Sequence, residues 1–123
     1  MTTETIEKLN QYHIKFAKTV DGRKNLIGND YIAGYIAAWG YWATPEDIDS
    51  FVGDINKCLN NTYDFDNEDT TSYSIHTFST ELASNGLKFF HKNANGIVER
   101  VTILPLLDLK ILLQAWRDFL VFG

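Results

Sequence analysis

The chain has a single cysteine, Cys58, so its 123 residues cannot form an internal disulfide. Cys58 falls on the apolar face of a predicted helix, where a thiol behaves as a small buried hydrophobic group. A nucleophilic cysteine needs an electropositive setting and a partner such as histidine, and neither is visible near it in the sequence. We therefore assign Cys58 a structural role.

Motifs of known chemistry are also missing. The sequence has no Gly-rich phosphate loop, no Cys-x-x-Cys pair, no Gly-x-Ser-x-Gly and no His-Glu-x-x-His. Residues 64–68 alternate oxygen ligands as a calcium loop does, but the sixth position of that loop is Asp69 instead of glycine and the twelfth is Ile75 instead of glutamate. We expect no metal, no cofactor and no enzymatic activity.

A long hydrophobic run is absent too. The apolar stretch 34–42 contains Gly34 and Gly40 and is shorter than the roughly 18 residues that a membrane-spanning helix needs. The first residues, 1–6, lack the basic and then apolar pattern of a secretory signal peptide. We expect a cytosolic protein that contacts no membrane.

Basic charge is scarce in the middle of the chain. The net charge is −5, and residues 44–70 carry eight acidic residues against the single Lys57, a local charge of −7. This balance argues against nucleic acid as a ligand, because phosphate binding needs concentrated Lys and Arg. It suits a basic protein partner or a divalent cation, and a solvated loop is the alternative. The acidic residues are Glu46, Asp47, Asp49, Asp54, Asp64, Asp66, Glu68 and Asp69.

Apolar residues at helical spacing predict three helices in the first half. The first covers residues 3–19 and ends at Asp21-Gly22. The second covers residues 29–42, for which a strand is the alternative because glycine weakens a helix. The third follows Thr44-Pro45-Glu46-Asp47, in which threonine is a good N-cap, proline suits the first turn and Asp47 can complete a capping box. That helix is expected to end at Asn60-Asn61.

Strand formers dominate from residue 71 to residue 104, after a polar loop at 63–72. The pairs Asn85-Gly86 and Asn95-Gly96 are hairpin signals. We predict antiparallel strands at about 71–82, 86–92 and 97–104, with a bulge or bend near His76-Thr77.

The last segment predicts the cover of this sheet, because three strands alone bury too little apolar surface. Pro105 breaks the third strand, and residues 106–120 form an apolar helix. The prediction is a single α+β domain over residues 1–123: N-terminal helices, a three-stranded antiparallel meander and a C-terminal helix packed on the sheet. One face of that helix carries Leu109, Leu112, Leu113, Trp116 and Leu120.

An acidic and aromatic surface is the best functional feature of the sequence. Aromatic residues can anchor a partner while carboxylates pair with its Lys and Arg. The candidate partner-binding residues are Tyr63, Asp64, Asp66, Glu68, Asp69 and Tyr73, with Phe65 between them.

Two other functions remain open. His76 and His91 fall near each other if the first two strands pair around Asn85, and two histidines with a lysine such as Lys88 can cleave RNA by general acid–base catalysis. An acidic protein without a basic groove makes a poor ribonuclease. Alternatively, a regulatory module binds a small ligand in a pocket lined by Trp39, Tyr41 and Trp42.

The C-terminal third resembles the small immunity proteins of bacterial toxin systems, including contact-dependent growth inhibition. The likeness rests on the turn at Asn95-Gly96, the strand and proline of residues 101–105, and the ending Leu-Leu-x-x-Trp-x-x-Phe-Leu at residues 112–120. The resemblance implies a cytosolic antidote that binds one cognate toxin domain, often a basic nuclease, and blocks its active site. No binding residue carries over by position, and the toxin, the mode of blocking and the oligomeric state stay open.

Overall fold

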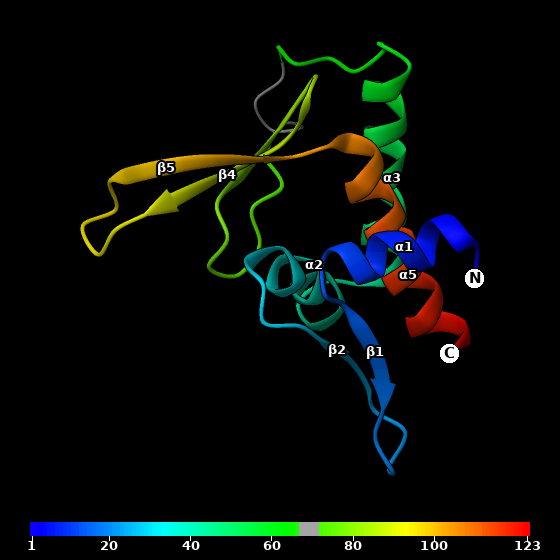
Figure 1. Ribbon diagram of the computed structural model, residues 1–123. Helices are drawn as coiled ribbons and strands as arrows, with labels where there is room; N and C mark the ends of the chain where they lie inside the picture. Colours follow the sequence, from blue (N-terminus) through cyan, green and yellow to red (C-terminus); the bar gives the residue numbers. More distant parts are fainter. Residues whose placement is uncertain (67–71) are drawn as a thin grey trace.

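Helices and antiparallel strands follow one another along the chain, and the fold is α+β, as predicted (Figure 1). The structure is a computed structural model and describes residues 1–66 and 72–123. Within these residues β3, β4 and β5 form an antiparallel sheet in that order, and β1 pairs with β2 in a separate hairpin. In chain order the elements are α1 (Thr3–Gln11), β1 (Lys15–Lys18), β2 (Lys24–Ile27), α2 (Tyr31–Tyr41), α3 (Pro45–Leu59), β3 (Thr80–Ala83), β4 (Gly86–Lys92), β5 (Val98–Leu104) and α5 (Leu106–Phe122).

The first helix is shorter than the sequence predicted. α1 ends at Gln11 instead of continuing to residue 19. His13 follows with a φ of +55°, a left-handed conformation that turns the chain out of the helix. Ile14 is then buried, and its N–H donates to the carbonyl of Leu9 at 2.8 Å. The expectation of a helix to residue 19 is therefore wrong.

A β-hairpin replaces the second half of that predicted helix. Asp21-Gly22 lies in the turn between β1 and β2, and Gly22 has the positive φ of 88° that glycine tolerates. The ring of Phe16 on β1 stacks on Trp116 of α5, with 5.5 Å between centroids. This distant packing overrides the helical spacing of the local sequence.

The segment predicted at 29–42 forms a helix and not a strand: α2 spans Tyr31–Tyr41. Its two glycines allow other side chains to approach closely. A Cβ on Gly40 would lie 2.4 Å from Nε1 of Trp116, and a Cβ on Gly34 would lie 3.1 Å from Cζ of Phe78. The residues that weaken the helical signal in the sequence therefore serve packing.

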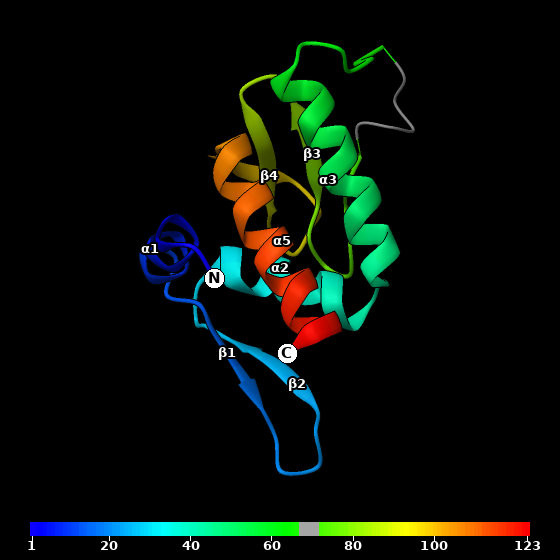
Figure 2. The ribbon, with the colours of Figure 1, turned by 90° about the vertical axis from the view of Figure 1, so that its right-hand side faces the viewer.

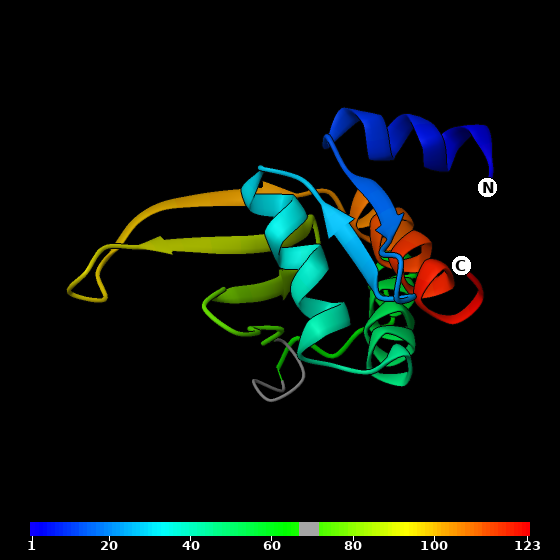
Figure 3. The same cartoon turned by 90° about the horizontal axis from the view of Figure 1, so that it is seen from below.

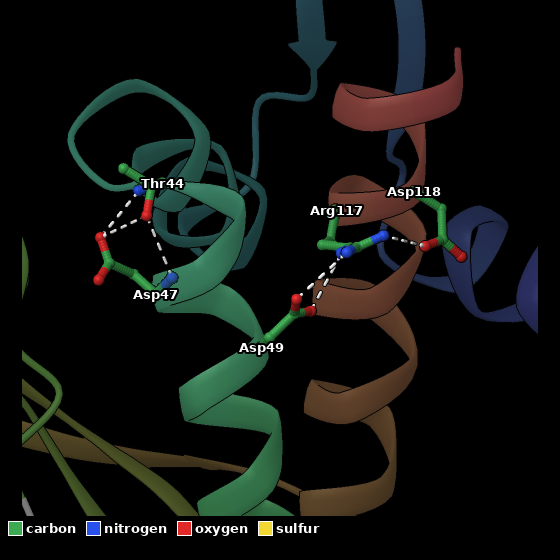
Figure 4. Close-up of polar contacts among 5 residues, drawn as sticks. All are labelled: Thr44, Asp47, Asp49, Arg117 and Asp118. Carbon is green, nitrogen blue, oxygen red and sulfur yellow. Dashed lines mark hydrogen bonds and ion pairs between the residues drawn. The ribbon is translucent and has the colours of Figure 1, made fainter.

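Helix α3 starts as its capping residues predicted (Figure 4). The side chain of Thr44 accepts the N–H of Asp47 at 3.2 Å, and Oδ2 of Asp47 accepts the N–H of Thr44 at 2.9 Å. The N–H of Thr44, and then its hydroxyl, which donates to the same Oδ2 at 3.0 Å, lower the pKa of Asp47, because both stabilise the ionised carboxylate. Pro45 occupies the first turn, where its missing N–H costs nothing.

The meander of β3, β4 and β5 matches the prediction except in its first strand. Of the predicted strand 71–82, only β3 is regular. Residues 75–78 form an isolated bridge in which His76 has a φ of +53°, which is the bend expected near His76-Thr77. β4 has the predicted bounds, and β5 begins one residue later than predicted, with a register shift opposite His91 and Lys92.

The C-terminal helix covers the sheet as predicted. α5 packs against β4 and also against α1, α2 and α3. Its residues Leu109, Leu112, Leu113 and Trp116 are fully buried. A buried carboxylate was not anticipated: Asp108 accepts a hydrogen bond from the Tyr12 hydroxyl at 2.5 Å and pairs with Lys8 at 2.8 Å. These two contacts fasten α1 to α5.

The exposed charges differ between the two ends of the molecule. Figure 2 shows the β1–β2 hairpin projecting at one end and the C-terminal end of α3 at the other. Lys15, Lys18 and Arg23 are exposed on the hairpin, whereas the segment that leaves α3 carries the exposed Asp64 and Asp66. Asp21 is also exposed in the hairpin turn, so the hairpin is basic on balance and the segment after α3 is acidic.

Candidate partner-binding surface

The segment after α3, residues 60–66, carries the first of the predicted partner-binding residues. Tyr63 is half-buried against the core, and its ring meets the ring of Phe65 edge-on with 4.8 Å between centroids. Oδ1 of Asp64 accepts the backbone N–H of Asp66 at 3.0 Å, which bends the chain into a turn. Phe65 is 40 % exposed, and both carboxylate residues are exposed. The turn therefore displays an aromatic ring between two acidic side chains.

Tyr73 occupies a different setting from the other candidates. Its hydroxyl donates a hydrogen bond to Asp54 on α3, and its ring lies flat on Phe51, with 3.8 Å between centroids and 7° between planes. Its carbonyl accepts the hydroxyl of Tyr35 at 2.8 Å. Burial, and then the Asp54 carboxylate, raise the pKa of Tyr73. The structure thus places Tyr73 in the packing between α2 and α3.

Several acidic residues of the predicted negative segment contact other parts of the chain. Arg117 of α5 donates to both oxygens of Asp49, at 3.0 and 3.2 Å, and also pairs with Asp118 at 3.5 Å (Figure 4). Asp54 receives the Tyr73 bond and lies 3.9 Å from Lys57. Part of the local charge of −7 therefore holds helices together. Glu68 and Asp69, two further candidates, lie outside the residues that the structure describes.

A pocket of about 820 Å³ adjoins the exposed ring of Phe65. Phe65 and Phe90 both line it, and Glu81 contributes a carboxylate. Much of the remaining wall is small and polar, formed by Ser72, Ser74, Ser79, Thr80 and Ser84. A concave wall of this kind, with aromatic rings on it, suits an inserted side chain of a partner protein.

The open face of the sheet continues this surface. Phe90 pairs with Val101 across β4 and β5, and Lys88 pairs with Ile103, so these four side chains share one face. Val101 and Ile103 are each 47 % exposed. Helix α2 covers the opposite face, where the ring of Tyr35 lies 4.9 Å from the ring of Phe89.

Sequence reasoning missed Phe90 and the open face, although a signal was present. In β4 the fully buried Leu87 and Phe89 alternate with Lys88 and Phe90. A strand with a covered and an open face alternates in this way. The alternation in β4 could therefore have identified Phe90 as a residue of the open face. It could not have shown that Phe65 lies beside Phe90.

The two histidines of the ribonuclease hypothesis have different neighbours. His76 stacks on Trp42, with 4.7 Å between ring centroids and 11° between planes. Nε2 of His91 lies 2.8 Å from the hydroxyl of Thr102, and Arg100 lies 3.4 Å from its Nδ1. Burial, and then the Arg100 charge, lower the pKa of His91. Among the contacts of the described residues, none joins the two imidazoles in support of a shared catalytic role.

The aromatic residues of the ligand-pocket hypothesis also lie in three settings. Trp39 is buried in the core, 5.0 Å from the ring of Phe51. The hydroxyl of Tyr41 accepts the N–H of Leu26 at 3.2 Å. Trp42 is 65 % exposed beside His76. The first two therefore take part in packing and backbone contacts.

The described residues contain no group of three or more His, Cys, Asp or Glu side chains placed to hold a metal ion. None of the helices in this part of the chain is long and apolar enough to cross a membrane. Comparison with known proteins gives no match among family models, curated proteins or solved structures.

Proposed function

We propose that the protein is an immunity protein that acts in the cytosol, where it binds and blocks a cognate toxin domain. The contact surface consists of the turn Tyr63–Asp66 and the adjoining pocket and open sheet face. Glu68 and Asp69 are proposed to contribute negative charge to the same interaction. The toxin domain is basic, as a nuclease is, and the protein itself is not an enzyme.

The observation that carries the proposal is the 40 % exposed ring of Phe65 between two exposed carboxylate residues. Such a ring can enter a pocket of the partner, where burial of an aromatic side chain provides much of the binding free energy. The pocket beside Phe65 can in turn receive a side chain of the partner. Each protein would thus insert a side chain into a pocket of the other at the same interface.

The carboxylates determine what kind of partner this surface attracts. Acidic groups around an aromatic anchor accelerate association with a basic protein and repel acidic ones. A nuclease binds the phosphates of its substrate with concentrated Lys and Arg. Asp64 and Asp66 can therefore compete with those phosphates for the same basic groups.

Tyr73 supports this surface from within. Its hydroxyl is engaged by Asp54 and its ring by Phe51. The tyrosine fixes the segment before β3, which also contributes Ser72 and Ser74 to the pocket wall. Its proposed role is accordingly to position the surface for the partner.

The test uses the protein encoded by the gene next to that of this chain. Its C-terminal domain is expressed with and without this protein, and growth and binding are measured. We expect growth arrest without this protein, rescue with it, and an association rate that falls as salt concentration rises. Replacing both Asp64 and Asp66 by Asn should slow association about tenfold, because electrostatic steering is reduced.

Matched variants separate this surface from the rest of the molecule. Glu46→Gln removes an exposed acidic charge near the N-terminal end of α3 and should leave association unchanged. His76→Ala and His91→Ala should retain full protection, because no catalysis is involved. Rescue that needs either histidine, or association that ignores both salt and the Asp64/Asp66 pair, overturns the proposal.

A further inference from the structure

Strand β5 forms one edge of the three-stranded sheet. In the part of the chain that the structure describes, β4 is the strand that pairs with β5, and the outer side of β5 has no strand beside it. Figure 3 shows β5 along the outer side of the sheet, with the β4–β5 hairpin extending past α2. Val98, Val101 and Ile103 of this strand are 44 %, 47 % and 47 % exposed. A long apolar edge strand favours pairing with another strand.

The hydrogen bonds of the sheet show which backbone groups of β5 face outward. Phe90 donates its N–H, at 2.9 Å, to a carbonyl just before β3. Successive residues of an antiparallel strand direct their N–H and C=O groups to opposite sides. The N–H and C=O groups of Phe89 therefore point to β5, and those of its partner Thr102 point to β4. Val101 and Ile103, on either side of Thr102, direct their N–H and C=O groups to the open edge.

We infer that the protein pairs with a second copy of itself through its β5 strands, antiparallel and with a two-fold axis at Val101. Other registers of a symmetric pair are unfavourable. An axis at Glu99 or at Arg100 sets like charges directly opposite each other, which destabilises a sheet. An axis at Thr102 sets Glu99 opposite Pro105, and an axis at Ile103 sets Val101 opposite Pro105, which has no N–H to donate.

The register centred on Val101 is complementary in its apolar contacts. Each Val101 side chain lies beside its symmetry mate, and each has Phe90 next to it on the same face. One continuous apolar row then crosses the joined sheets. The register shift near Lys92 limits the new ladder to residues 99–103.

The same register brings charged groups of the two copies together. It places Arg100 of the second copy opposite Thr102, on the face of the sheet toward α2. Thr102, Asp30 and the chain's own Arg100 line one pocket, of about 290 Å³, below that face. Asp30 is the carboxylate of this pocket, and it can pair with the guanidinium of the second copy, with the reciprocal contact formed by symmetry.

The dimer leaves the Phe65 turn and its pocket free, whereas Val101 and Ile103 of the open sheet face lie at the dimer contact. Phe65 and its pocket lie beside β3, at the edge opposite β5. A dimer joined through β5 thus presents two such surfaces on its outer ends. Self-pairing is independent of the proposed function, since it needs no toxin and is measured on the protein alone.

Light scattering during size-exclusion chromatography tests the inference. We expect the mass to rise with concentration from 14.1 kDa toward twice that value. Val101→Lys should give the monomer mass at every concentration, because a charge then stands at the centre of the contact. Val98→Lys, with nearly the same exposure but outside the ladder, should dimerise as the wild type does. A wild-type monomer throughout, or a Val101→Lys dimer, overturns the inference.

A disulfide provides a second readout that does not depend on a disruptive change. In the proposed dimer the two Val101 residues form a hydrogen-bonded antiparallel pair. The Cα atoms of such a pair lie about 5.5 Å apart, within the range that a disulfide spans. In a Cys58→Ser background, Val101→Cys should form a covalent dimer under mild oxidation. Val98→Cys should not, because its symmetry mate lies several residues away along the ladder. Equal cross-linking of the two variants contradicts the two-fold axis at Val101.

Discussion

Tyr73 donates a hydrogen bond to Asp54, and this contact joins the segment before β3 to helix α3. The ring of Tyr73 also stacks on Phe51, one turn earlier on the same helix. A tyrosine that looks like a partner anchor in the sequence is therefore a cross-link within the fold. Its hydroxyl and its ring contribute separately, and the two contributions can be measured.

Tyr73→Phe should lower the free energy of unfolding by about 1–2 kcal/mol. The change keeps the stacked ring and removes the bond to a half-buried carboxylate, which loses a charge-assisted donor. Urea denaturation of the wild type and the variant measures the difference. Tyr73→Leu should cost more, because it removes the stack as well. A Tyr73→Phe variant as stable as the wild type would show that the bond to Asp54 does not stabilise the fold.

Three tyrosines should make the stability of the protein depend on pH in the alkaline range. Tyr12, Tyr35 and Tyr73 all have a pKa raised above 10.0, chiefly because burial disfavours the phenolate. The folded protein then keeps protons that the unfolded chain releases. The contribution to stability is complete below pH 10.0 and is lost as the pH rises above it. Urea midpoints measured across this range should fall with pH, and less steeply for Tyr73→Phe. A flat profile contradicts the prediction.

Two helical glycines should respond in opposite ways to alanine. A Cβ on Gly53 of α3 would meet no atom of the described residues within 4 Å, so Gly53→Ala should stabilise the protein by about 0.5–1 kcal/mol through helix propensity. A Cβ on Gly40 would lie 2.4 Å from the Trp116 ring. Gly40→Ala should therefore destabilise by about 1–3 kcal/mol, as overpacking does. Thermal unfolding of both variants measures this pair, and stabilisation by Gly40→Ala would refute the close packing of α2 on α5.

Local signals were sufficient where the deciding contacts are local. The capping box of Thr44 and Asp47 and the turn glycines of the meander act over a few residues, and α3, β4 and β5 appear where they were predicted. The β1–β2 hairpin was not predictable in this way. Phe16 keeps helical spacing with the residues before it, and its stack on Trp116 depends on a helix at the other end of the chain.

In the candidate surface, too, some features follow from the local sequence and others depend on tertiary packing. The exposure of Asp64 and Asp66 agrees with the polar, aperiodic sequence around them. The engagement of Tyr73 by Asp54 required α3 to be placed against the segment before β3. The pairing of Phe65 with Phe90 in one pocket likewise depends on tertiary structure. Charge and composition thus indicated the surface, and long-range packing decided its members.

Trp116→Ala should remove the centre of the core. Trp116 is fully buried and stacks on Phe16, and its ring lies against Gly40. A truncation of this size costs about 3–5 kcal/mol, a large part of the roughly 5–15 kcal/mol that typically stabilises a domain. We expect loss of the cooperative urea transition or a strongly lowered midpoint. The exposed Trp42 offers a matched control, and Trp42→Ala should leave the midpoint nearly unchanged.

Asp108→Ala should detach α1 from the rest of the fold. The variant leaves the Tyr12 hydroxyl and the Lys8 ammonium without the carboxylate that they share at the start of α5. Unpaired polar groups at a largely buried site cost about 1–3 kcal/mol. Hydrogen exchange should show faster opening of α1 than of α3, because α1 loses its main polar contact with α5. Asp118→Ala, an exposed change on the same helix, should leave exchange in α1 as it is. If both variants protect α1 equally, apolar contacts around the buried Leu9 hold the helix in place and the Asp108 contacts do not.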